Sequence, residues 1–271
     1  MTAYVRPRKS LGQHWLVDRR VLARIARAAD FTDEDTVVEI GPGKGALTRF
    51  LAPRAARLIL VEVDANLAAN LREHYADATN VVVVEGDVLE MPVEEILNRG
   101  GGRIPYVVVG NLPYFIGSPI VRKFLTASVT PRWLVVTLQA EVAARMAAGT
   151  GDMSYLSVET QILAEPRLLF KIAPGAFRPA PKVHSAVLRL DVRDSPEVEV
   201  DDRERFLELV RAGFAAPRKR LRNSLGVGLR IPGAEAGAIL ADAAVDPDQR
   251  PQDLSLDDWR DVYFAYRRCA G

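Results

Sequence analysis

Five short apolar runs, separated by segments of helical periodicity, constrain the fold of this 271-residue chain more than any other feature. The runs are rich in β-branched residues, and they span residues 36–40, 58–63, 81–85, 106–110 and 133–139. Strands that are apolar throughout, rather than at alternate positions, are typical of a parallel sheet covered by helices on both faces. Helical patterns between the runs, at residues 46–51, 65–75 and 119–127, supply the crossover connections. We therefore predict a doubly wound, mostly parallel α/β domain.

The pattern changes after Pro166. Two further strand-like runs, at residues 167–173 and 185–191, are joined by a proline-rich loop and predict an antiparallel pair that closes the sheet. An acidic connector then leads into four helical segments, at residues 202–215, 218–226, 234–243 and 255–267. We place the boundary at residue 195, between a large domain (1–195) and a small all-helical domain (196–271).

Cysteine content and the N-terminal segment indicate the compartment. Cys269 is the only cysteine, which excludes an internal disulfide and any multi-cysteine zinc site, and we predict no metal centre. The first residues, MTAYVRPRKS, lack the apolar stretch of a signal peptide, and no apolar run is long enough to span a bilayer. We expect a cytoplasmic monomer that does not contact a membrane.

The net charge of +1 conceals two basic clusters. Residues 1–27 carry seven Arg or Lys side chains against a single acidic residue, Asp18, and the run PRKRLRN occupies 217–223. Nothing acidic within the second run neutralises it, and such segregated charge is typical of a surface that meets nucleic-acid phosphates. From the basic N-terminal segment (1–18) and the second run we select as candidate contacts Arg8, Lys9, Arg218, Lys219, Arg220 and Arg222.

A glycine-rich turn follows the first strand. In EIGPGKGALT, residues 39–48, Gly41 and Gly43 let the backbone turn sharply and approach a ligand at a helix N-terminus. The turn also fits the dinucleotide pattern G-x-G-x-x-G/A, with Glu62 about 20 residues further on to accept from ribose hydroxyls. Pro42 argues against a dinucleotide, because it removes a backbone N–H that a pyrophosphate would use.

Further polar residues follow the other strands of the predicted sheet. Asp87 comes after the third run and could accept from an adenine amino group, and Asn111 comes after the fourth. Ligands of open α/β sheets bind at the carboxyl ends of the strands, where Gly41, Glu62, Asp87 and Asn111 all fall. The sequence therefore predicts one ligand site at this edge, and the tetrapeptide Asn-Leu-Pro-Tyr (111–114) has no obvious role in hydride transfer.

Taken together, these motifs resemble those of the ribosomal RNA adenine dimethyltransferase family, in particular its small-subunit branch. The motifs are KSLGQHWL (9–16), EIGPGKGALT, VEVD (61–64), GDVL (86–89), NLPY, FRPAPKVHS (177–185) and RKRLRNSL (218–225), and the resemblance runs nearly end to end. It implies a Rossmann-like class I methyltransferase sheet with a helical RNA-binding domain. It also implies that S-adenosylmethionine is used to dimethylate N6 of two adjacent adenosines in the 3′-terminal hairpin of 16S rRNA, within a precursor of the 30S subunit.

The resemblance implies roles for individual residues as well. Those expected to bind the cofactor are His14, Leu16, Gly41, Gly43, Glu62, Asp87, Val88 and Asn111. Those expected to act on the target base are Asn111, Leu112, Pro113, Tyr114 and Phe177, the last as a second stacking face. The chain differs from the usual family pattern at His14, Trp15 and Phe115.

The tetrapeptide has a chemical rationale in this setting. The exocyclic nitrogen of adenine is a weak nucleophile because its lone pair is delocalised into the ring. The side-chain oxygen of Asn111 and a backbone carbonyl in Leu112–Pro113 could accept hydrogen bonds from both N6 hydrogens and favour a pyramidal nitrogen. Tyr114 offers a ring on which an extruded adenine can stack.

Three other functions remain open from the sequence. The first is an Erm-type enzyme that modifies 23S rRNA, although Leu112 and the long helical tail favour the small-subunit enzyme. The second is a non-catalytic ribosome-assembly factor, which the intact set of site residues argues against. The third is a DNA adenine methyltransferase, which would carry a target-recognition domain that we do not find in this chain.

Overall fold

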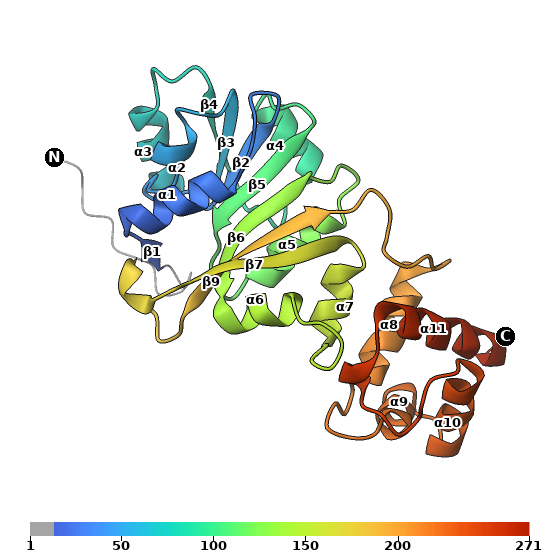
Figure 1. Cartoon of the computed structure of the whole chain (residues 1–271). Coiled ribbons are helices and arrows are strands. Elements are labelled where there is room, and N and C mark those ends of the chain that lie inside the picture. Colours follow the sequence, from blue (N-terminus) through green and yellow to red (C-terminus); the bar gives the residue numbers. More distant parts are fainter. Residues whose placement is uncertain (1–13, 271) are drawn as a thin grey trace. The chain divides into compact units, whose positions relative to one another are not determined.

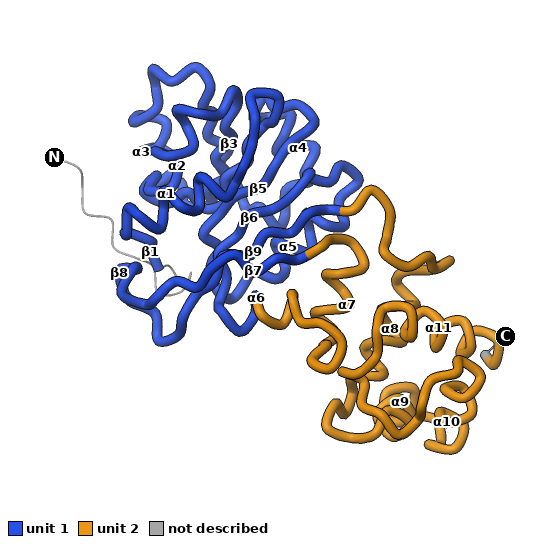
Figure 2. Tube along the Cα trace, in the orientation of Figure 1, with its two compact units in different colours: residues 1–143, 166–192 blue, residues 144–165, 193–271 orange. Residues whose placement is uncertain are grey.

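The computed structural model describes residues 14–270, and Arg8 and Lys9 therefore lie outside the described residues. The chain forms two compact units (Figure 2): unit 1 comprises residues 1–143 and 166–192, and unit 2 comprises residues 144–165 and 193–271. The sequence assigned residues 144–165 to the large domain. They belong instead to unit 2, because Val158 and Ile162 are buried in the same apolar cluster as Phe206 and Trp259 of the helical tail.

Unit 1 is built on a seven-stranded sheet in the order β4-β3-β2-β5-β6-β9-β7 (Figure 1). Its strands are β2 (Thr36–Ile40), β3 (Arg57–Glu62), β4 (Val81–Glu85), β5 (Tyr106–Asn111), β6 (Trp133–Gln139), β7 (Ala164–Ile172) and β9 (Ser185–Val192). Neighbours from β4 through β6 pair in parallel, and β9 pairs with β6 in the antiparallel sense. The predicted α/β sheet with a closing antiparallel strand is confirmed.

Helices connect the strands of unit 1 and lie on both sides of the sheet (Figure 1). They are α1 (Arg19–Ala28), α2 (Thr48–Leu51), α3 (Ala65–His74), α4 (Val93–Arg99), α5 (Gly117–Leu125) and α6 (Ala140–Met146), the last of which continues into unit 2. Helix α3 begins directly after β3 because Asp64 caps it, its carboxylate accepting from the backbone N–H groups of Asn66 and Leu67. The polar residues that follow β3 are thus held at a fixed point of the sheet edge.

A second, two-stranded sheet is not evident from the sequence. Strand β1 (Trp15–Leu16) pairs with β8 (Phe177–Arg178), which follows the short helix η2 (Pro174–Ala176). The backbone N–H of Val17 also donates to the carbonyl of Ala176, at 2.9 Å. The small sheet therefore joins the start of the described chain to the loop between β7 and β9.

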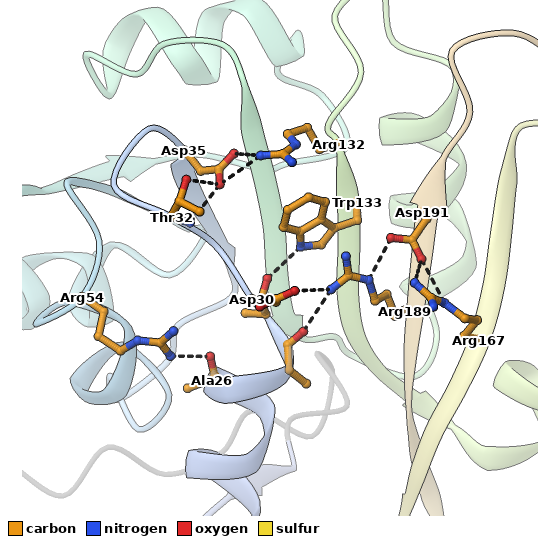
Figure 3. A network of polar contacts seen from close by, with 12 residues as sticks. Ala26, Asp30, Thr32, Asp35, Arg54, Arg132, Trp133, Arg167, Arg189 and Asp191 are labelled. Atoms are coloured by element: carbon orange, nitrogen blue, oxygen red, sulfur yellow. Dashed lines mark hydrogen bonds and ion pairs between the residues drawn. The ribbon is translucent and has the colours of Figure 1, made fainter.

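A polar network holds β9 against the end of α1 (Figure 3). Arg189 of β9 forms ion pairs with Asp191, at 2.8 Å, and with Asp30, at 3.7 Å. Its guanidinium lies over the ring of Trp133, 4.4 Å from the centroid, and the indole N–H of Trp133 donates to the carbonyl of Ala29 at 2.7 Å. These contacts gather at the amino end of β6, which is the edge opposite the polar residues predicted to bind a ligand.

Unit 2 is helical. Its helices are α7 (Tyr155–Gln161), α8 (Arg203–Gly213), α9 (Leu221–Leu229), α10 (Gly233–Asp242), η3 (Pro251–Asp253) and α11 (Leu256–Ala270). Helix α9 begins at Leu221, later than the predicted 218, because the N–H groups of Leu221 and Arg222 donate to the carbonyls of Gln249 and Pro247. Within the described part of the chain, no helix combines the length and apolar character needed to cross a membrane.

Candidate active site

A pocket opens at the carboxyl ends of β2, β3, β4 and β5, within unit 1. It brings together every residue that the sequence predicted to bind the cofactor, and four of the five residues predicted to act on the base. These lining residues are His14, Leu16, Gly41, Gly43, Glu62, Asp87, Val88, Asn111, Leu112, Pro113 and Tyr114. The structure thus places residues that are distant in sequence around one cavity.

Glu62 fixes the glycine-rich turn. It is buried at the end of β3, where one carboxylate oxygen accepts from the N–H of Gly43 and the other from the N–H of Asp64, each at 3.0 Å. Gly43 has φ of +57°, a left-handed conformation that favours glycine at this position of the turn. Burial raises the pKa of Glu62, against the opposing effect of its backbone hydrogen bonds.

Glu39 is a second buried carboxylate in the pocket wall, and no role was predicted for it from the sequence. It lies in β2, is 2% exposed, and its Oε2 has no hydrogen-bond partner. Burial, with a smaller contribution from the nearby Glu62, raises the pKa of Glu39 to about 8, against the lowering effect of hydrogen bonds from Thr48. An acidic residue in an otherwise apolar strand is the sequence signal that could have identified it.

The buried Glu39 predicts a pH-dependent difference in stability. Between pH 4.5 and about 8, the folded protein retains a proton that the unfolded chain has released. The effect of Glu39 on the free energy of unfolding is therefore most favourable below pH 4.5. The free energy of unfolding then falls as the pH rises toward 8. Glu39→Gln should gain free energy of unfolding relative to wild type across this window, by up to about 1.4 kcal/mol per pH unit. Urea unfolding at several pH values measures the difference.

The prediction would be contradicted if the free energies of unfolding of the two proteins changed with pH in the same way. The control is Glu34→Gln, which removes a carboxylate at an exposed site.

The orientation of the Asn111 amide follows from its partner. Its side-chain nitrogen donates to the backbone carbonyl of His14, at 3.1 Å. A carbonyl can only accept, so the amide must present its NH₂ group to His14, which leaves Oδ1 as an acceptor for another group. The contact links residues 97 positions apart in the sequence.

Tyr114 is held on two sides. Its hydroxyl lies 2.6 Å from the hydroxyl of Ser185, the fully buried first residue of β9. The ring stacks on His14, with centroids 5.3 Å apart and planes inclined by 27°. His14 is itself anchored by a hydrogen bond between Nδ1 and the carbonyl of Pro179, at 2.8 Å. Burial raises the pKa of the Tyr114 hydroxyl, partly offset by its bond to Ser185. The sequence predicted the ring of Tyr114 but not this anchoring.

The structure does not bring Phe177 to the pocket. The ring is fully buried in the core of unit 1, in the strand that pairs with β1, where Phe177 is opposite Leu16. It is absent from the pocket lining and, in this position, exposes no ring face to a base. Its strand supports the pocket wall from behind, through β1.

The basic run of unit 2 also differs from expectation. Arg220 and Arg222 both form ion pairs with Asp248, at 3.1 and 3.0 Å. No acidic residue lies within the run, as the sequence shows, but Asp248 approaches from another segment, so two of its four basic side chains are not left unpaired. Arg218 and Lys219 lie before helix α9 and are exposed.

Three carboxylates, those of Glu39, Glu62 and Asp87, line the pocket against one lysine, Lys44, and this balance favours a cationic organic ligand. Glu39 and Glu62 are both buried in its walls, and a positive charge nearby would favour their ionised forms. Pro42, also in the lining, offers no backbone N–H to an anion. Among residues 14–270, no group of three or more His, Cys, Asp or Glu side chains is placed to hold a metal ion.

Solved structures with this fold include two close in shape. The 23S rRNA methyltransferase ErmE superposes with a TM-score of 0.72 at 32% identity, covering 93% of this chain and 98% of that one. A dimethyladenosine transferase from Plasmodium falciparum superposes with a TM-score of 0.79 at 23% identity, covering 95% and 98%. The second likeness supports the fold alone.

Curated relatives are closer in sequence. Ribosomal RNA small subunit methyltransferase A from Moorella thermoacetica is 43% identical, over 94% of this chain and 91% of its own length. The enzyme of that name from Geobacter metallireducens is 42% identical, over 94% of both chains. The family described as ribosomal RNA adenine dimethylase matches residues 5–266. With a match of this extent, the chain belongs to the ribosomal RNA adenine dimethylase family.

Proposed function

We propose that this protein uses S-adenosylmethionine to dimethylate N6 of two adjacent adenosines in the 3′-terminal hairpin of 16S rRNA. It would act as a cytoplasmic monomer on a precursor of the 30S subunit. The orientation of Asn111, with a side-chain oxygen available at the pocket, is the observation that carries the proposal. The names of the curated relatives, at 42–43% identity, support the small subunit over the Erm-type alternative.

The pocket fits the proposed cofactor in charge and in hydrogen-bonding groups. Glu62 would accept from ribose hydroxyls and Asp87 from the adenine amino group, and both residues line the pocket. The unpartnered Oε2 of Glu39 suits the ammonium group of the methionyl part. When bound, S-adenosylmethionine supplies an electrophilic methyl group on a sulfonium centre.

The residues of the tetrapeptide would prepare the adenine for transfer. Asn111 Oδ1 would accept one N6 hydrogen and a backbone carbonyl of Leu112–Pro113 the other, which localises the nitrogen lone pair. The ring of Tyr114, anchored through Ser185, would stack on the extruded base. Because these groups are positioned by the protein itself, little reorganisation is needed when the RNA arrives.

Glu62→Gln tests the placement of the cofactor. The glutamine keeps the size of the side chain but replaces one acceptor oxygen by a donor, so a charge-assisted hydrogen bond is lost. We expect the dissociation constant for S-adenosylmethionine to rise by about 10- to 100-fold, corresponding to roughly 1.5–3 kcal/mol. Isothermal titration calorimetry gives the value. The matched control is Glu85→Gln, at the register partner of Glu62 on β4 but outside the pocket; equal affinities in both variants would reject the assignment.

Labelled methyl transfer tests the function itself. Purified protein is incubated with labelled S-adenosylmethionine and with small or large ribosomal subunits that lack the modification, and the labelled nucleotides are mapped. We expect label only on small-subunit RNA, at two adjacent adenosines. Label confined to large-subunit RNA would identify an Erm-type activity, and tight subunit binding without label would identify an assembly factor.

The basic run of unit 2 is proposed to contact RNA phosphates. Among the described residues, Arg218 and Lys219 form no ion pair, whereas Arg220 and Arg222 would first have to exchange Asp248 for phosphate. The double variant with Arg218→Gln and Lys219→Gln should therefore lose about two phosphate contacts. The plot of the logarithm of the binding constant for small subunits against the logarithm of the salt concentration should become correspondingly less steep. Arg220→Gln with Arg222→Gln should reduce it less. Filter binding across a salt series measures both slopes, and an unchanged slope in the first pair would exclude the contact.

A further inference from the structure

Four exposed apolar side chains, here called the apolar rim, lie on chain segments that adjoin the edge of the sheet where the pocket opens. Seven large apolar side chains of the described residues are exposed, and four lie on segments that reach this edge: Val17, Val63, Phe115 and Val183. Val63 lines the pocket, and Val183 lies just before Ser185, which pairs with the last residue of β6. An apolar rim around a ligand pocket indicates a surface that a bound partner covers.

Phe115 is the most prominent member of this rim. Its exposed fraction is 81%, the largest of the seven. The residues on either side, Tyr114 and Ile116, both line the pocket, whereas Phe115 does not. The ring therefore lies outside the pocket but directly beside its mouth, where a ligand that covers it would remove a large apolar surface from water.

The turn that carries Phe115 is anchored on both sides. Tyr114 is bound to Ser185 through its hydroxyl at 2.6 Å, and the N–H of Ile116 donates to the carbonyl of Pro113 at 3.2 Å. A ring presented on a fixed turn loses little freedom when a partner binds, so its contact surface is preorganised.

The charge around Phe115 is compatible with a polyanion. The segment from residue 110 to 125 contains no Asp or Glu. The basic residues of helix α5, Arg122 and Lys123, lie in its last turn, at the end away from Phe115. Lys123 donates to the carbonyl of Leu89 at 3.0 Å. A flat, exposed apolar ring in a segment without carboxylates suits the face of a nucleic acid base, whose phosphates meet no like charge from this segment.

We propose that Phe115 is a stacking platform for the nucleobase adjacent to the adenine that enters the pocket; this inference rests on the proposed function. An adenine extruded from a stack leaves its neighbour with one face exposed, and unstacking is costly. The ring of Phe115 covers that face. Because the two target adenosines are adjacent, the platform holds the second adenine while the first is methylated.

Ile104 provides a matched control. It is 70% exposed and lies before β5, whereas Phe115 follows the same strand. The two side chains therefore have similar exposure at opposite ends of one strand. A loss of exposed apolar surface in general would affect both positions equally, but a contact with the substrate base would affect only Phe115.

Steady-state methylation of unmodified small subunits tests the proposal. Phe115→Ala should raise the KM for subunits by about 5- to 100-fold, the range expected for one lost base–aromatic stack. Its kcat, its affinity for S-adenosylmethionine and its unfolding midpoint should stay close to those of wild type. Phe115→Trp should keep a low KM, Phe115→Leu should behave like Phe115→Ala because it lacks a ring face, and Ile104→Ala should match wild type.

A photo-crosslinker identifies the partner directly. With p-benzoylphenylalanine at position 115, we expect a crosslink to the nucleotide next to the target adenosine. A crosslink to a ribosomal protein, or an unchanged KM in Phe115→Ala alongside an active wild type, would overturn this inference alone. A wild-type protein that transfers no methyl group to small subunits would overturn the proposed function and this inference with it.

Discussion

Asn111→Ala should lower kcat by about 10²–10³-fold while leaving the affinity for small subunits nearly unchanged. The amide oxygen is expected to act mainly as charge develops on N6, so its loss removes stabilisation of the transition state rather than of the bound substrate. Single-turnover methylation with saturating subunits isolates this step. A kcat within a few-fold of wild type would show that the oxygen does not act on the base.

Two further variants separate the parts of the amide. Asn111→Asp keeps an acceptor oxygen but places a carboxylate against the backbone carbonyl of His14, where the amide now donates at 3.1 Å. We expect it to be nearly as impaired as Asn111→Ala, because the orientation is lost although the acceptor remains. Asn98→Ala, at an exposed site on α4, should leave kcat unchanged.

Gly228→Ala should be the most damaging small substitution in unit 2. A Cβ at Gly228 of α9 would lie 2.2 Å from the backbone oxygen of Ala212 on α8 and 2.4 Å from its Cα. Backbone atoms cannot rotate away, so the two helices must separate, which we expect to lower the free energy of unfolding of this unit by about 3 kcal/mol. Urea unfolding followed by far-ultraviolet circular dichroism measures the loss.

Gly237→Ala is the matched control for this prediction. Gly237 lies in helix α10 of the same unit, and a Cβ there would meet nothing within 4 Å. This variant should gain about 0.5–1 kcal/mol, because alanine loses less backbone entropy in a helix. The affinity of both variants for S-adenosylmethionine should match wild type, because every pocket residue belongs to unit 1. A stable Gly228→Ala protein would show that α8 and α9 can repack.

The sheet could be predicted from the sequence because its signal is local. Strands β2, β4 and β6 coincide with the predicted runs 36–40, 81–85 and 133–139. The meeting of Gly41, Glu62, Asp87 and Asn111 in one pocket was also predictable, because parallel strands bring their carboxyl ends to one edge. Their individual roles remain predictions.

Other features depend on contacts that no local pattern reveals. Strands β1 and β8 have two residues each, too few to show a hydrophobic period. Their partners, such as Leu16 and Phe177, are separated in the sequence by most of unit 1. The burial of Phe177 depends on this pairing, and the ion pairs of Arg220 and Arg222 depend on Asp248 from a distant segment. Such side-chain partners are set by tertiary packing and not by propensity.

The pairing of β1 with β8 has a consequence for synthesis of the protein. The wall of the pocket at His14 is anchored to Pro179, which lies 165 positions later in the sequence. A nascent chain therefore exposes residues 14–16 long before their partners leave the ribosome. Ligands stabilise only a state that can bind them. The cofactor should therefore contribute nothing to folding on the ribosome until translation has passed β8. Before that point, the partly synthesised chain depends on contacts among the strands and helices already made.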